Sequence, residues 1–307
     1  MKKAKGVKGD GGSKKDAAGA LPRKRRARSR ESMNEGLEAL VLLMDLIDSS
    51  GGGLPPPETP LDMAEEIVAE AWMSENARRR KALARKALAV SPDCVDAYVL
   101  LAAEAPSPEE ARSLLEEAIM VGERVLGPQA FQEDVGEFWG LIETRPYMRA
   151  REMLASCLWR LGDREAAIAH YRELLRLNPN DNQGIRYLLA RCFLETGQDE
   201  ELTRLLASYA DDASAVWMYT AVLLAFRQKG ATVANEKKLA KALEANPFVP
   251  DYLLGRRRLP RRMPDLIGMG DESEAVDYAA AHKVLWEQTP GALDWLRHAR
   301  GGRVLPI

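Results

Sequence analysis

The chain has 307 residues, of which 46% are apolar and 29% are charged, and this composition is typical of a soluble globular protein. Its longest apolar run, residues 39–47, contains Asp45 and is far shorter than the roughly 20 residues that span a bilayer. The start of the chain, Met1 to Ala20, lacks the apolar core of a signal peptide. These features argue against a secreted or membrane-spanning protein, and we expect a cytoplasmic protein without a membrane partner.

The N-terminal segment is strongly basic. Residues 1–30 contain twelve lysines and arginines against Asp10 and Asp16, so the rest of the chain is acidic. Because such a segment cannot bury enough apolar surface to offset its ordering entropy, we expect residues 1–31 to form a disordered basic tail. A capping-box spacing from Ser32 to Glu35 then predicts a helix, and a Pro/Gly-rich linker completes residues 32–60.

Residues 61–250 show an internal repeat of paired helices. The separation of Gly162 from Gly230 equals that of the Asn-Pro pair at 178–179 from the Asn-Pro pair at 246–247. This shared offset is twice the period of the tetratricopeptide repeat, which is about 34 residues. A glycine fits the turn between the two helices of a repeat, and the proline ends the second helix.

The second helix of one repeat has a clear apolar stripe, because Ala167, Tyr171 and Leu174 recur at helical spacing. Residues 121–146 break the pattern and are interpreted as an insertion that carries a short helix. The predicted fold is all-α: a right-handed α-solenoid of tetratricopeptide-like helix–turn–helix repeats with a C-terminal capping helix pair.

The C-terminal segment, residues 251–307, is predicted to contain an Arg/Pro-rich stretch followed by the capping helices. One helix is expected from about 272 to 288, and a Thr-Pro pair at 289–290 starts another. Four side chains of the first of these helices are expected to close the last repeat: Val276, Ala280, Val284 and Leu285.

Several stretches resemble the C-terminal region of the suppressor-of-tumorigenicity-seven family: SPDCVDAYVLLAAEA, residues 149–187, NPFVPDYLLGRRRLP, GDESEAVDYA and TPGALDWL. The resemblance covers roughly residues 60–298. It implies a tetratricopeptide-like helical scaffold without enzymatic activity. Eukaryotic members of that family carry N-terminal membrane segments, whereas this chain has a basic tail there, so we do not carry membrane attachment over.

No pattern of catalytic or metal-binding residues stands out. The histidines, His170, His282 and His298, show no metal-ligand spacing, and Cys94, Cys157 and Cys192 are predicted to be free and buried. Phosphate-loop and nucleophile-elbow patterns are absent from the sequence. We therefore expect a protein that is not an enzyme and needs no cofactor or metal.

A peptide groove is expected where the first helices of the repeats line the concave side. Its candidate residues are Arg149, Gln183, Arg186 and Trp217, which offer guanidinium forks, an amide and an aromatic face to a partly acidic protein or peptide partner. The alternatives are ion pairs within the chain for the two arginines and a place in the core between repeats for Trp217.

A second candidate surface is an arginine cluster formed by Arg256, Arg257, Arg258, Arg261 and Arg262. It suits phosphate, nucleic acid or an acidic partner, and the alternative is docking against acidic residues of the same chain. The leading hypothesis is a non-enzymatic scaffold for protein binding. The second is a nucleic-acid-associated protein anchored by the basic tail, which neutralises phosphates, and by the arginine cluster. The tail's own alternative is a solubilising extension.

Overall fold

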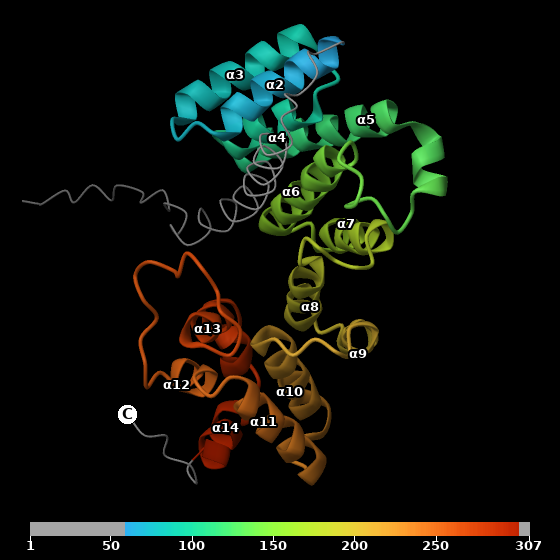
Figure 1. Cartoon of the computed structure of the whole chain (residues 1–307). Helices are drawn as coiled ribbons and strands as arrows, with labels where there is room; N and C mark the ends of the chain where they lie inside the picture. Colours follow the sequence, from blue (N-terminus) through green and yellow to red (C-terminus); the bar gives the residue numbers. More distant parts are fainter. Residues whose placement is uncertain (1–58, 301–307) are drawn as a thin grey trace, which may run out of the picture.

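A computed structural model gives the fold of residues 59–300 (Figure 1). The basic tail predicted for residues 1–31 lies outside the described residues, as does the segment predicted for residues 32–60 apart from Thr59 and Pro60. Within residues 59–300 every regular element is a helix. The helices are α2 (Pro60–Trp72), α3 (Ala77–Val90), α4 (Val95–Ala103), α5 (Pro108–Glu133), α6 (Arg145–Leu161), α7 (Arg164–Leu177), α8 (Ile185–Thr196), α9 (Asp199–Ser208), α10 (Ala215–Lys229), α11 (Val233–Ala245), α12 (Val249–Leu253), α13 (Glu272–Glu287) and α14 (Ala292–Arg300).

The helices stack in chain order. From α2 to α11 each helix packs against the next, and the first helices of neighbouring pairs also touch, α4 against α6 and α8 against α10. Figure 1 shows the pairs following one another from α2 and α3 at one end to α14 at the other. The predicted all-α solenoid with terminal capping helices is therefore confirmed.

The α6–α7 pair shows how the sequence specifies one repeat. Helix α6 ends at Gly162, whose φ of 90° is the left-handed conformation that glycine adopts without steric cost. The Asp163 side chain accepts a hydrogen bond from the Ala166 N–H and starts α7. Ala167, Tyr171 and Leu174 are all buried, which confirms the predicted stripe.

The segment between α5 and α6 is built around a sharp bend. Helix α5 turns at Gly127, where φ is 71° and ψ is 163°, and Pro128 then starts its last turns. The chain returns to the stack through Phe138, which is fully buried, and the Leu177 carbonyl accepts hydrogen bonds from the N–H groups of Gly136 and Phe138. The bent segment is thereby fastened to the end of α7.

Helix α13 closes the C-terminal end of the solenoid through a face that differs from the expected one. Val276 and Leu285 are buried as expected, but Ala280 and Val284 are exposed. A spacing of four residues drifts around a helix of 3.6 residues per turn, so residues 276, 280 and 284 do not stay on one face. The buried face is instead made mainly by Ala275, Tyr278, Ala279, His282 and Trp286.

Candidate interaction surface

The first helices α6 and α8 each leave one stripe of side chains partly open to solvent. On α6 the partly or fully exposed stripe includes Glu152, Met153 and Ser156, and on α8 it includes Leu188 and Arg191. Because the other faces of these helices are packed against neighbours, this side is where a partner could reach them. The predicted groove residues lie on or next to these stripes. Their contacts within the chain determine which of their polar groups and rings are free to bind a partner.

Arg149 joins two first helices. Its guanidinium forms a two-pronged ion pair with Asp96 at the start of α4, with 3.0 Å between Nε and Oδ1. Both side chains are largely buried. The contact matches the alternative of an ion pair within the chain, here with a residue of the neighbouring repeat.

Gln183 makes the next link along the stack. Its Nε2 donates a hydrogen bond to the Glu152 carboxylate of α6 at 3.1 Å. Its buried Oε1 has no hydrogen-bond partner among residues 59–300. The amide thus connects α6 to the turn before α8 and keeps one acceptor unused.

Arg186 lies at the junction of α8, α9 and α10. It forms ion pairs with Asp181 at 2.9 Å and Asp212 at 2.8 Å, and its guanidinium stacks over the rings of Tyr187 and Tyr209. Burial pushes the pKa of Asp212 up, but hydrogen bonds from Ser214, Tyr187 and Arg186 hold it below its usual value. The guanidinium of Arg186 is therefore fully engaged within the chain. We call Arg186 and its partners Asp181, Asp212, Tyr187 and Tyr209 the polar node.

Trp217 belongs to the same junction. Only 3% of its surface is exposed, and its ring meets those of Tyr187 and Tyr209 edge to face. Its Nε1 has no hydrogen-bond partner within the described part of the chain. The burial matches the alternative of a core residue between repeats, so the indole face is not available to a ligand in this conformation.

The arginine cluster follows α12 and is fully on the surface. Arg257 pairs with Glu272, Arg262 pairs with Asp265 at 2.7 Å, and Arg256 lies 3.7 Å from Asp251. Arg258 and Arg261 form no ion pair with any residue in the range 59–300. Docking against acidic residues of the chain therefore accounts for part of the cluster and leaves two charges open.

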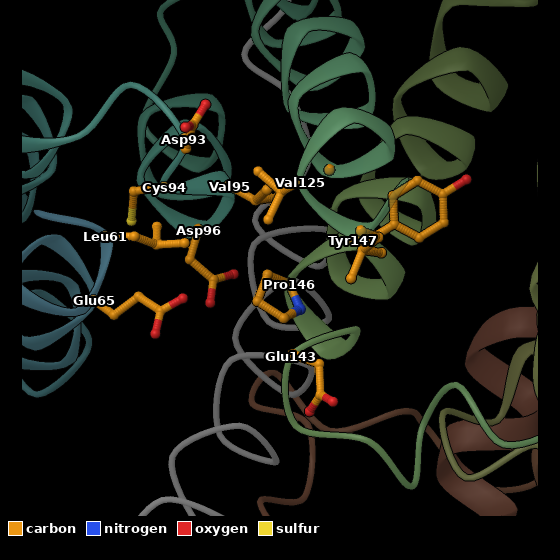
Figure 2. A pocket seen from close by; sticks show the side chains of 12 residues that line it. Leu61, Glu65, Asp93, Cys94, Val95, Asp96, Val125, Glu143, Pro146 and Tyr147 are labelled. Carbon is orange, nitrogen blue, oxygen red and sulfur yellow. The ribbon is translucent and has the colours of Figure 1, made fainter. Parts of the chain in front are cut away.

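A small pocket of about 30 Å³ lies where α2, α4, α5 and α6 meet (Figure 2). Figure 2 shows the carboxylates of Glu65 and Asp96 reaching into the same gap, with Pro146 opposite them. Burial raises the pKa of Glu65, and the charges of Asp96 and Asp62 raise it further. The volume is enough for about one water molecule, so this pocket is too small for a substrate. It is a small gap where helices of neighbouring repeats meet.

A larger cleft of about 470 Å³ was not anticipated from the sequence. It lies beside the bend of α5 and is lined by Glu123, Pro128, Phe131, Gln132, Tyr147, Arg151, Glu173 and Arg176. The only signal for it in the sequence was the break in the repeat at residues 121–146. Sequence periodicity reports which face of a helix is buried, but not where a bent helix leaves a hollow.

The histidines and cysteines show no arrangement for catalysis. Burial, helped by the charge of Arg151, lowers the pKa of His170 to about 4, and burial raises the pKa values of Cys94 and Cys192 to about 12. Cys94, Cys157 and Cys192 are free and buried, as predicted. Within residues 59–300 no group of three or more His, Cys, Asp or Glu side chains could hold a metal ion.

These features define the class of the protein: a helical-repeat protein whose first helices are tied together by polar side chains. The sequence model of the family described as ST7 protein matches residues 58–304, and the chain belongs to this family. Among residues 59–300 no helix is both long enough and apolar enough to cross a bilayer.

Curated relatives agree with this assignment. The chain is 31% identical over 267 residues to the protein ST7 homolog of Drosophila melanogaster, covering 78% of this chain and 50% of that protein. It is 29% identical over 257 residues to the human suppressor of tumorigenicity 7 protein-like, covering 76% and 44%. The chain therefore spans about half the length of the curated relatives it matches.

Among solved structures, one similar chain is YrrB, described as a TPR protein with an unusual peptide-binding site. The TM-score is 0.42 and the sequence identity is 17%, with 66% of this chain and 90% of that chain covered.

Proposed function

We propose that the protein is a non-enzymatic interaction scaffold that binds a segment of a partner protein along the first helices α4, α6, α8 and α10. One observation carries the proposal: the open stripes belong to helices that are linked in series. Asp96 and Arg149 join α4 to α6, Glu152 and Gln183 continue toward α8, and Arg186 and Asp212 reach α10. A series of linked helices presents its open stripes as one continuous surface, as repeat proteins do when they bind extended segments.

The predicted groove residues then have two kinds of role. Arg149, Gln183, Arg186 and Trp217 set the spacing of the first helices, because their polar groups and rings are engaged between repeats. Direct contact falls to neighbouring, partly exposed side chains such as Leu188 and Arg191. Within residues 59–300 the ion-pair partner of Arg191 is Glu195 on its own helix, and an i,i+4 pair of this kind contributes only about 0.3–0.5 kcal/mol. A carboxylate of the partner can therefore compete for Arg191.

The test compares two double variants of the full chain in affinity purification from the native cells. Leu188→Asp with Arg191→Glu alters the open stripe of α8. Arg204→Glu with Ala207→Asp makes the same change of charge at exposed positions of the second helix α9. We expect the first variant to lose a co-purifying protein that the wild type and the α9 variant retain. Equal recovery of all partners by both variants would overturn the proposal.

A further inference from the structure

The longest irregular segment in residues 59–300 connects α12 to α13. It comprises residues 254–271 and contains no helix. Loops longer than about 12–15 residues, as this one is, are uncommon in folded domains and are usually functional or disordered. This segment contains the arginine cluster, whose open charges the solenoid does not use.

The loop is held in place at its base. Gly268 N–H donates to Ser273 Oγ at 2.9 Å, Gly270 N–H donates to Glu274 Oε2 at 2.8 Å, and Asn246 Nδ2 donates to the Asp271 carbonyl at 2.8 Å. Leu259 and Met263 also pack against the main core. The hydrogen bonds of Gly268 and Gly270 therefore fix the backbone of the stretch that leads into α13.

The part of the loop just before α13 is an apolar tip, formed by Leu266, Ile267 and Met269. Their exposed fractions are 82%, 48% and 74%. Three large aliphatic side chains this close together in water are unfavourable, and such patches usually mark an interaction site. A partner that shields these side chains from water would bury most of their apolar surface.

The same loop carries an excess of positive charge. It holds five arginines against Asp265 and Asp271, and Arg258 and Arg261 form no ion pair with any described residue. At its start, Gly255 lies beside the Lys283 ammonium group of α13. The loop thus combines the apolar tip, which lies between Asp265 and Asp271 in the sequence, with two arginines that form no ion pair with the described residues and can bind anionic groups.

We propose that this loop docks on an anionic lipid surface, with Leu266, Ile267 and Met269 entering the acyl boundary and Arg258 and Arg261 binding headgroup phosphates. A bilayer surrounds protruding aliphatic side chains without a shaped pocket, and its negative surface potential attracts nearby arginines. The contact is peripheral and needs no spanning helix. It goes beyond the proposed scaffold function and departs from the expectation that the protein has no membrane partner.

The experiment places an environment-sensitive fluorophore on the full chain at Leu266→Cys. The native cysteines are buried, so labelling is selective for the loop. Vesicles contain either phosphatidylcholine alone or phosphatidylcholine with about 30% phosphatidylserine, at about 150 mM salt. We expect a blue shift of the emission with the anionic vesicles only. Val233→Cys, labelled in the same way on α11 at a position 69% exposed, should show no shift.

Two further variants separate the contributions of the tip and the charges. Met269→Asp should weaken the vesicle affinity of the labelled protein about tenfold, because it removes apolar insertion and adds a charge. Arg258→Gln with Arg261→Gln should weaken it roughly 30-fold, at about 1 kcal/mol for each arginine. Unchanged circular dichroism spectra would show that both variants fold.

The basic N-terminal segment could also bind anionic vesicles, and the site of the probe distinguishes that case. Co-sedimentation without a blue shift at position 266 would overturn the proposal and assign binding to another part of the chain. A blue shift that survives Met269→Asp at full affinity would overturn it as well. Loss of a protein partner in the tip variant, without any vesicle response in the wild type, would assign the loop to a protein interface instead.

Discussion

At the scale of single residues, the polar node around Arg186 illustrates how the repeats are joined. The Asp181 side chain is fully buried and its charge is balanced by Arg186. Removing one partner of a buried ion pair leaves an uncompensated charge, which costs about 3–5 kcal/mol. We predict that Arg186→Ala lowers the free energy of unfolding by about this amount, measured by urea denaturation.

Arg191 on the same helix is the matched control. It forms an i,i+4 pair with Glu195, and both side chains are partly exposed. Arg191→Ala should change the free energy of unfolding by less than about 0.5 kcal/mol. If the two variants were equally stable, Arg186 would have no structural role beyond that of an ordinary surface arginine.

His170 gives the protein a specific sensitivity to acid. Its pKa is about 4 in the folded state, against an ordinary value of 6.5, so the unfolded chain binds more protons between these values. Stability from this group is fully present above pH 6.5 and is lost as the pH falls toward 4. Because His170 is only partly buried, solvent screens part of this effect. We predict that His170→Gln makes the free energy of unfolding less dependent on pH in this window, by about 1–2 kcal/mol.

Denaturation of the wild type and of His170→Gln at about pH 7 and about pH 4.5 measures the effect. When the pH is lowered from about 7 to about 4.5, the wild type should lose more of its free energy of unfolding than His170→Gln does. Parallel pH profiles for the two proteins would show that His170 is accessible to solvent when folded.

Sequence reasoning at this scale identified side chains but not their partners. It placed Arg149, Gln183 and Arg186 on first helices and left ion pairing within the chain as an alternative. It did not identify Asp96, which is 53 residues from Arg149, because periodicity gives the face of a helix and not its distance from another helix. The partners depend on how closely successive pairs stack.

At the scale of elements, the repeat pattern predicted most of the fold. The glycine at 162 and the Asn-Pro stops at 178–179 and 246–247 mark helix ends that the structure shows. The region of the α5 bend was interpreted as an insertion, because residues 121–146 break the repeat pattern. The cleft beside this bend could not be predicted, since it depends on the direction taken after Gly127.

The close contact between α5 and α6 depends on Gly122. A Cβ atom at this position would lie 2.8 Å from Cδ2 of Tyr147, whose ring is buried. Glycine to alanine within a helix normally stabilises by about 1 kcal/mol, but overpacking here costs about 1–3 kcal/mol. We therefore predict that Gly122→Ala lowers the melting temperature.

A double-variant cycle checks the cause. In a Tyr147→Ala background the Cγ and Cδ2 atoms are absent, so Gly122→Ala should become neutral or stabilising. The same destabilisation in both backgrounds would mean that the effect arises from the α5 backbone and not from its contact with α6.

At the scale of the whole molecule, the solenoid has two hydrophobic cores of different character. The core of α2, α3 and the start of α4 is made largely of small side chains: Ala64, Val68, Ala71, Ala84, Ala87, Cys94, Ala97 and Leu100. The main core runs from α4 to α14 and contains large buried rings, among them Tyr219, Tyr278 and Trp286. Hydrophobic stabilisation follows the apolar area buried, so the two cores differ in strength.

Because each repeat contacts only its neighbours, a weak end of a solenoid can open without the rest. We predict that amide hydrogens of α2 and α3 exchange at least about 100-fold faster than those of α10 and α13. Val68→Ala should accelerate exchange in α2 and α3 alone, whereas Val222→Ala, at a buried position of α10, should accelerate it across the main core. Hydrogen exchange with mass spectrometry resolves these segments. Equal protection of α3 and α10, or a response of α10 to Val68→Ala, would show that the stack unfolds as one cooperative unit despite its two cores.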